Sequence, residues 1–195
     1  AARGVTSAQD GKTNMTDRDE KTQSHAPDVY AVDKLIGEAR KLAADYRRAT
    51  GKPLPGVSAE IAVHDAARLL DLTLTPDSAG YDAVGGGDRE GKKMQIKGRV
   101  IFDEAKSGQR VGQLKVNEEW DSVVLVLMDE DYQPFEIYEA ERHDLVEAQS
   151  STSSARAKRG AVSVAKFKII GRLVWERDSG LTEDVWENRP AGHSP

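Results

Sequence analysis

Two neighbouring stretches of the chain carry acid, amide and ammonium groups at the spacing of strands. The first contains Asp82, and the second contains Gln95, Lys97 and Arg99 at alternate positions, with the glycine-rich turn 85–91 between them. Successive side chains of a strand point to opposite faces, so these three alternate residues project to one side. A carboxylate, an amide oxygen and an ammonium at one sheet edge suit metal-assisted attack on a phosphodiester.

That chemistry assigns a role to each side chain. Mg²⁺ (or Mn²⁺) supplies Lewis acidity and prefers a few oxygen ligands plus waters. Asp82 would be the principal anionic ligand, Gln95 a neutral second ligand, and Glu60 an added carboxylate from a preceding helix, directly or through water. Lys97 would orient the attacking water or stabilise the charged transition state. Arg99 would clamp a phosphate.

Each of these residues also has a structural interpretation that the sequence leaves open. Lys97 and Arg99 could be solvated on a surface hairpin, with Asp82 capping a turn. Glu60 could be an ordinary acid in the first turn of a helix, where the helix dipole favours it. His64, one turn further on, is more often hydrogen-bonded than a metal ligand.

Periodicity predicts the elements that must position this site. Apolar residues at helical offsets predict helices over 30–48 and 58–70. The continuous apolar run 122–128 has strand length and indicates a central strand buried on both faces. A further strand is expected near Phe135, and Pro134 at its start predicts a sheet edge. A late helix is expected after the capping residue Ser163, with an apolar stripe of four residues: Val164, Phe167, Ile170 and Val174.

Glu60 on a helix, Asp82 on one strand and Gln95-Ile96-Lys97 on the next resemble the PD-(D/E)xK nuclease superfamily, and more narrowly a small bacterial family within it. The resemblance covers roughly 57–138. It implies a restriction-endonuclease-like α/β fold with a central mixed β-sheet flanked by α-helices, dependence on Mg²⁺ (or Mn²⁺), and cleavage of DNA. It also allows a homodimer. The sequence departs from the usual motif because Gln95 stands where Glu or Asp is common, a variant found in branches that resemble Mrr-type restriction nucleases.

Charge is distributed unevenly, although the net charge is only -5. Residues 88–115 hold eight Lys/Arg against four Asp/Glu, residues 155–172 hold six Lys/Arg and no acid, and residues 117–147 hold eleven acids against one Arg. Either these are solvated surfaces of mixed sign, or two basic patches share one face with the acids on the far side. On the second interpretation five cations are candidates for binding DNA phosphates: Lys93, Arg99, Arg110, Lys166 and Lys168.

Composition sets the remaining expectations. The absence of cysteine excludes disulfides, thiolate zinc sites and a cysteine nucleophile. No apolar run approaches the roughly 20 residues that span a bilayer, so a cytoplasmic protein with no membrane partner is expected. We expect a disordered tail over 1–28, a single nuclease-like domain over 29–176 with its core at 57–140, and a frayed tail over 177–195. Two alternatives to a nuclease stay open: an inactive nucleic-acid-binding module of the same fold, and a partner-binding protein that uses the acidic 117–147 surface.

Overall fold

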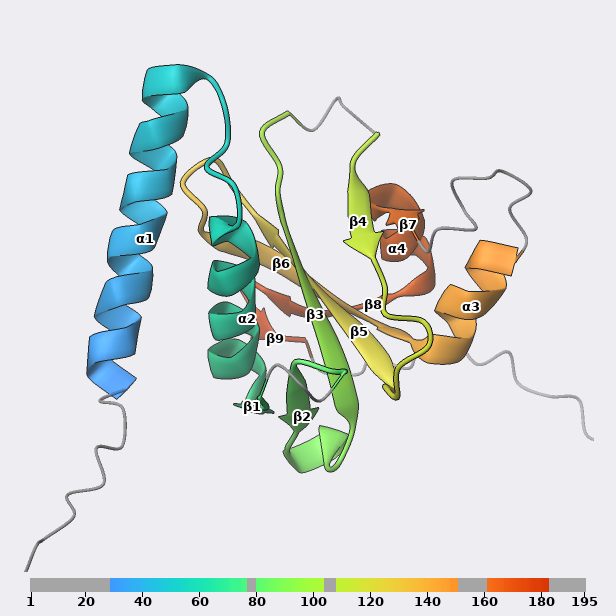
Figure 1. The fold of residues 1–195 in the computed structure, drawn as a ribbon. Coiled ribbons are helices and arrows are strands. Elements are labelled where there is room, and N and C mark those ends of the chain that lie inside the picture. Colours follow the sequence, from blue (N-terminus) through green and yellow to red (C-terminus); the bar gives the residue numbers. More distant parts are fainter. Residues whose placement is uncertain (1–28, 77–79, 104–107, 151–160, 183–195) are drawn as a thin grey trace, which may run out of the picture.

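A mixed seven-stranded β-sheet forms the centre of the molecule, with helices on both faces (Figure 1). The computed structural model describes residues 29–76, 80–103, 108–150 and 161–182. Helices α1 (Val29–Thr50) and α2 (Val57–Leu70) cover one face. Helices α3 (Arg142–Ser150) and α4 (Val164–Ile170) cover the other, together with a separate two-stranded sheet. None of the helices in these ranges is long and apolar enough to cross a membrane.

The strand order in the main sheet is β1-β2-β3-β5-β6-β8-β9, and β4 pairs with β7 in the small sheet. The bounds are β1 (Leu72–Leu74), β2 (Ala83–Gly85), β3 (Lys93–Val100), β4 (Arg110–Gln113), β5 (Ser122–Met128), β6 (Pro134–Glu141), β7 (Ala161–Ser163), β8 (Arg172–Glu176) and β9 (Gly180–Leu181). A short 3₁₀ helix, η2 (Gly87–Arg89), lies in the turn between β2 and β3.

Strand β5 is the buried centre that its apolar run predicted, since all seven of its residues are buried. It pairs with β3 in parallel, and the register places Lys97 opposite Leu125 and Arg99 opposite Leu127. Parallel neighbours need a crossover connection. Here the chain crosses through β4 and the loop that follows it, so this connection lies over the face of β3 that carries Lys97.

The two faces of β3 pack against different layers. Met94 and Ile96 lie in the core beneath α2. Gly98 belongs to the same face, and a Cβ there would lie 2.5 Å from Ala62 Cβ, so only glycine permits this close approach of α2. Gln95, Lys97 and Arg99 therefore face the opposite side, toward β4.

Strand β6 is an interior strand, so the edge position predicted from Pro134 is wrong. It pairs with β5 on one side and β8 on the other. The proline lacks a backbone N–H to donate, and it is accommodated because it sits opposite Met128 where the register of the pair shifts.

The late helix is shorter than its stripe predicted. Ser163 caps α4 as expected, accepting a hydrogen bond from Lys166 N at 3.1 Å. The helix ends at Gly171, where a Cβ would lie 2.9 Å from the carbonyl oxygen of Phe167. Beyond it β8 begins and places Val174 in the sheet core, and β9 pairs with β8 after Glu176.

Only part of the apolar stripe of α1 packs against the body of the protein. Ala43 is fully buried, whereas Leu35 and Leu42 remain 61% and 62% exposed. Arg40 of the same helix turns inward and donates hydrogen bonds to Asp65 of α2 and to the carbonyl of Tyr132.

Candidate active site

Asp82 lies directly before β2 and is fixed to β3 by hydrogen bonds. Its backbone nitrogen donates to Met94 O at 2.8 Å, and its carboxylate oxygen Oδ2 accepts from the backbone nitrogen of Ile96 at 2.6 Å. Ile96 is the residue next to Lys97 on β3, and the negative charge of Asp82 partly opposes the lowering of the pKa of Lys97 by burial. The carboxylate and the ammonium therefore belong to one site, on the face of β3 turned toward β4.

Lys97 is a partly desolvated ammonium. Burial is the largest cause that lowers its pKa below the ordinary value of 10.5. The charge of Asp82 opposes this shift, while repulsion from Lys115 and Arg99 lowers the pKa further. A cation that has lost part of its hydration interacts strongly with an anion brought beside it.

Gln95 is fully buried and hydrogen-bonded to the backbone of one residue. Its Oε1 accepts from Lys115 N at 3.1 Å, and its Nε2 donates to Lys115 O at 3.4 Å. The amide oxygen that the sequence offered as a metal ligand thus already has a partner. Nothing in the local sequence indicated this pairing, because the partner is 20 residues away along the chain.

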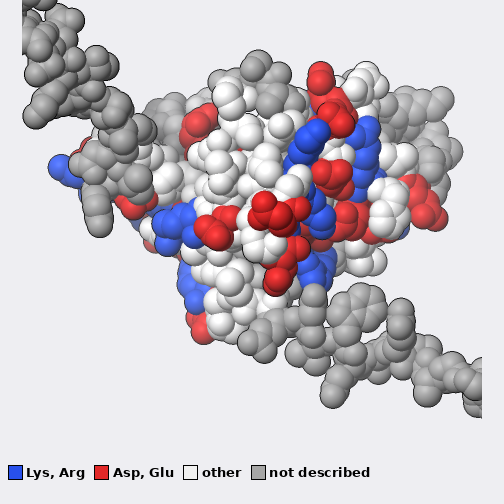
Figure 2. Space-filling model, turned by 90° about the horizontal axis from the view of Figure 1, so that it is seen from below, with Lys and Arg blue, Asp and Glu red and all other residues white. Residues whose placement is uncertain are grey.

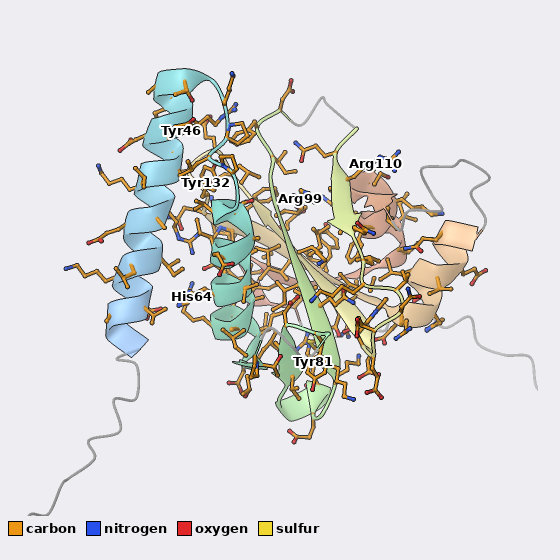
Figure 3. All side chains as sticks on the ribbon, in the orientation of Figure 1. Tyr46, His64, Tyr81, Arg99, Arg110 and Tyr132 are labelled. Carbon is orange, nitrogen blue, oxygen red and sulfur yellow. The ribbon has the colours of Figure 1, made fainter. Side chains whose placement is uncertain are left out.

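Arg99 lies along β4 instead of projecting freely (Figure 3). Its Nε donates to the carbonyl of Arg110 and its Nη1 to the carbonyl of Gly98. Burial lowers the pKa of the guanidinium. Gly112 makes room for it: the glycine has φ of +100°, and a Cβ there would lie 2.4 Å from Arg99 Nη2.

Glu60 is not brought to this cluster. It is exposed on α2, which packs on the other face of β3, and its carboxylate makes no hydrogen bond or ion pair with any described residue. One turn later, His64 Nε2 lies 2.9 Å from Asp33 Oδ1 and so links α2 to α1. The structure thus joins Asp82, Lys97 and Arg99, with Gln95 beside them, and leaves Glu60 apart.

The donor set decides which metal ion could bind here. In the part of the chain that the structure describes, no three His, Cys, Asp or Glu side chains converge into a metal site. Asp82 offers its second oxygen, Oδ1. A single carboxylate fits Mg²⁺ or Mn²⁺ only where water and substrate phosphates supply the other ligands, which is a common arrangement for Mg²⁺.

Two of the other four predicted phosphate-binding cations lie beside carboxylates. Lys93 Nζ lies 2.8 Å from Glu119, and Lys168 Nζ lies 2.7 Å from Glu136. Lys166 is exposed on α4 and Arg110 is exposed on β4.

The acids of 117–147 do not all lie on the surface. Strand β5 in their middle is buried, and Glu139 is buried with Arg89 Nε at 2.8 Å, Ser122 Oγ at 3.0 Å and Lys92 Nζ at 3.3 Å. From the end of the molecule that carries β2 and η2, acidic and basic side chains are intermixed (Figure 2). On that face the charges are not separated by sign.

Comparison with known proteins adds no family. The sequence matches no model of a protein family and no curated protein. Membership of the PD-(D/E)xK superfamily stays a prediction, and the function has to be argued from the site.

Proposed function

We propose that the chain is a metal-dependent DNA endonuclease of the PD-(D/E)xK type that hydrolyses phosphodiester bonds beside Asp82 and Lys97. One observation supports this most: the carboxylate of Asp82 is hydrogen-bonded at 2.6 Å to the backbone nitrogen of Ile96, the residue next to Lys97 on β3. The backbone of Ile96 holds the carboxylate, and β3 holds the lysine. An anchored acid beside a desolvated ammonium can orient a phosphodiester and stabilise the negative charge that develops as it is hydrolysed.

In this proposal the residues divide the work. Asp82 would hold Mg²⁺ or Mn²⁺, which when bound supplies Lewis acidity and lowers the pKa of coordinated water. Lys97 stabilises the negative charge that grows on the phosphoryl oxygens. Arg99, oriented by two backbone carbonyls, contributes positive charge beside it. We assign no metal to Gln95, since its oxygen accepts from Lys115.

A second candidate is a nucleic-acid-binding module that does not cleave. The positions of two predicted metal ligands favour it. The amide of Gln95 is hydrogen-bonded to the backbone of Lys115, and Glu60 lies on α2, on the other side of the sheet. Asp82 is then the sole carboxylate that the described residues place at this site. With few anionic ligands, a metal ion would bind weakly.

Plasmid cleavage separates the two. Supercoiled DNA is incubated with the wild type, Asp82→Asn and Lys97→Met, in Mg²⁺ and in Mn²⁺. The controls are Asp88→Asn and Lys52→Met, which change exposed residues on η2 and in the α1–α2 loop.

Metal-dependent cleavage that falls about 100-fold or more in both site variants, and not in the controls, supports the nuclease. DNA binding with no cleavage in either metal supports the module and contradicts the nuclease.

A further inference from the structure

Lys115 lies in the loop between β4 and β5, and two buried side chains hold its backbone in place. Gln95 bonds both its N–H and its carbonyl, at 3.1 and 3.4 Å. The indole Nε1 of Trp120 donates to the same carbonyl at 2.9 Å. Gln95 is 0% exposed and Trp120 is 2% exposed, so these contacts are made inside the protein. The position of Lys115 relative to β3 is therefore fixed by the core and not by the loop alone.

The side chain of Lys115 stays exposed while its backbone is held. The positive charge of Lys115 repels the ammonium of Lys97 and lowers its pKa, as the charge of Arg99 also does. Lys115 is thus held beside Gln95, two residues from Lys97 on β3, and the charges of Lys115 and Arg99 both act on the Lys97 ammonium. Like charges held together repel one another, and an anion placed among them relieves that repulsion. A nucleic-acid backbone, with successive phosphates each carrying a charge, is an anion of the right kind.

We propose that Lys115 binds a substrate phosphate and that Gln95 is its positioning residue. This rests on the proposed function and names the backbone of DNA as what the site grips. It also gives a reason for glutamine at position 95. Holding both backbone groups of Lys115 needs a donor and an acceptor in one side chain, and a glutamate in its ionised form can only accept.

DNA binding without metal tests the role of Lys115. A fluorescently labelled duplex is titrated in EDTA, so that cleavage does not enter, over a range of salt concentrations. We expect Lys115→Gln to weaken binding and to reduce the slope of log affinity against log salt by about 1. The matched control is Lys34→Gln, an exposed lysine on α1, across the sheet from β4, which should keep the wild-type slope.

The role of Gln95 is tested by non-additivity. If it acts through Lys115, Gln95→Met should weaken binding about as much as Lys115→Gln, and the double variant should lose little more. If Gln95→Met does not fold, Gln95→Asn replaces it, because that change keeps a neutral amide and shortens its reach toward Lys115. An NMR titration of Lys97 supplies a readout without DNA. Lys115→Gln removes the neighbouring charge, and Gln95→Met lets Lys115 move away, so each change should raise the pKa of Lys97.

Three results would overturn the proposal: no DNA binding by the wild type, an unchanged salt slope in Lys115→Gln, or losses from the two single changes that simply add. None of these measures cleavage. A failure here is therefore distinguishable from a failure of the plasmid assay, which tests the endonuclease itself.

Discussion

The carboxylate of Asp82 accepts a hydrogen bond from the backbone nitrogen of Ile96 at 2.6 Å, and this bond ties the start of β2 to the middle of β3. The acid is thereby held one residue from Lys97 along the neighbouring strand, with its charge acting on that ammonium. The pairing depends on strand register and not on flexible side chains. It is the geometric basis for treating the hairpin as a reaction site.

Replacing Lys97 by methionine should stabilise the protein at neutral pH. The folded state lowers the pKa of Lys97, chiefly by burial, so the unfolded chain binds the proton more tightly. The free energy of unfolding of the wild type should then rise as the pH increases from the folded pKa toward 10.5. Urea denaturation should show Lys97→Met more stable than the wild type at neutral pH, with the gap narrowing toward pH 10.5. A less stable Lys97→Met would show that the lysine is structural.

Adding a methyl group at Gly112 should displace Arg99. Alanine at φ of +100° is strained, and its Cβ would lie 2.4 Å from the guanidinium. We expect Gly112→Ala to cost about 1–3 kcal/mol of unfolding free energy and to weaken DNA binding. The control is Gly108→Ala, whose Cβ would meet nothing within 4 Å. That variant should change stability by less than about 0.5 kcal/mol. Equal effects from the two changes would contradict the packing described for Arg99.

The contact between α1 and α2 should depend on a buried ion pair. Asp65 is 0% exposed and receives the guanidinium of Arg40, which is 8% exposed. Asp65→Ala leaves that cation buried alone and should cost about 3–5 kcal/mol. Replacing both residues, as Arg40→Met with Asp65→Leu, should cost less than the single change. Urea denaturation of the double-mutant cycle checks this, and strictly additive losses would show that the two residues are not coupled.

Glu139 should make stability dependent on acid pH. Burial would raise its pKa, but the hydrogen bond from Arg89 and the charge of Lys92 outweigh burial and lower it below 4.5. Its contribution is therefore present above pH 4.5 and is lost as the pH falls through the folded pKa. Glu139→Gln should cost about 3 kcal/mol at neutral pH, and the difference from the wild type should shrink in acid. Glu141→Gln, at an acid whose side chain is 42% exposed, should cost less than about 1 kcal/mol.

The local pattern of polar and apolar residues in the sequence was enough to predict the strands that carry the site. The alternation of polar residues predicted that Lys97 and Arg99 share a face, and the apolar run 122–128 predicted the buried strand beside them. These predictions depend on neighbours in sequence, where periodicity reports burial directly.

Features that depend on distant partners could not be predicted in this way. The sequence predicted Gln95 to be a metal ligand. Its hydrogen bonds to Lys115 could not be predicted, because they form only when the connection between β3 and β5 folds over β3. The segment 172–176 continued the helical stripe of α4, and only its pairing with β6 makes it a strand. The inward position of Arg40 on α1 depends on Asp65, a partner 25 residues further along the chain.

The central claim is that Asp82 and Lys97 act as one catalytic unit, and single-turnover cleavage of DNA by Asp82→Asn, Lys97→Met and the double variant tests it most directly. Residues that act together are non-additive in their effects on rate. We predict that each single change lowers the metal-dependent rate about 100-fold or more, and that the double variant is no slower than the worse single one. A wild type that binds DNA and never cleaves it, or single variants that cleave at the wild-type rate, would contradict the claim.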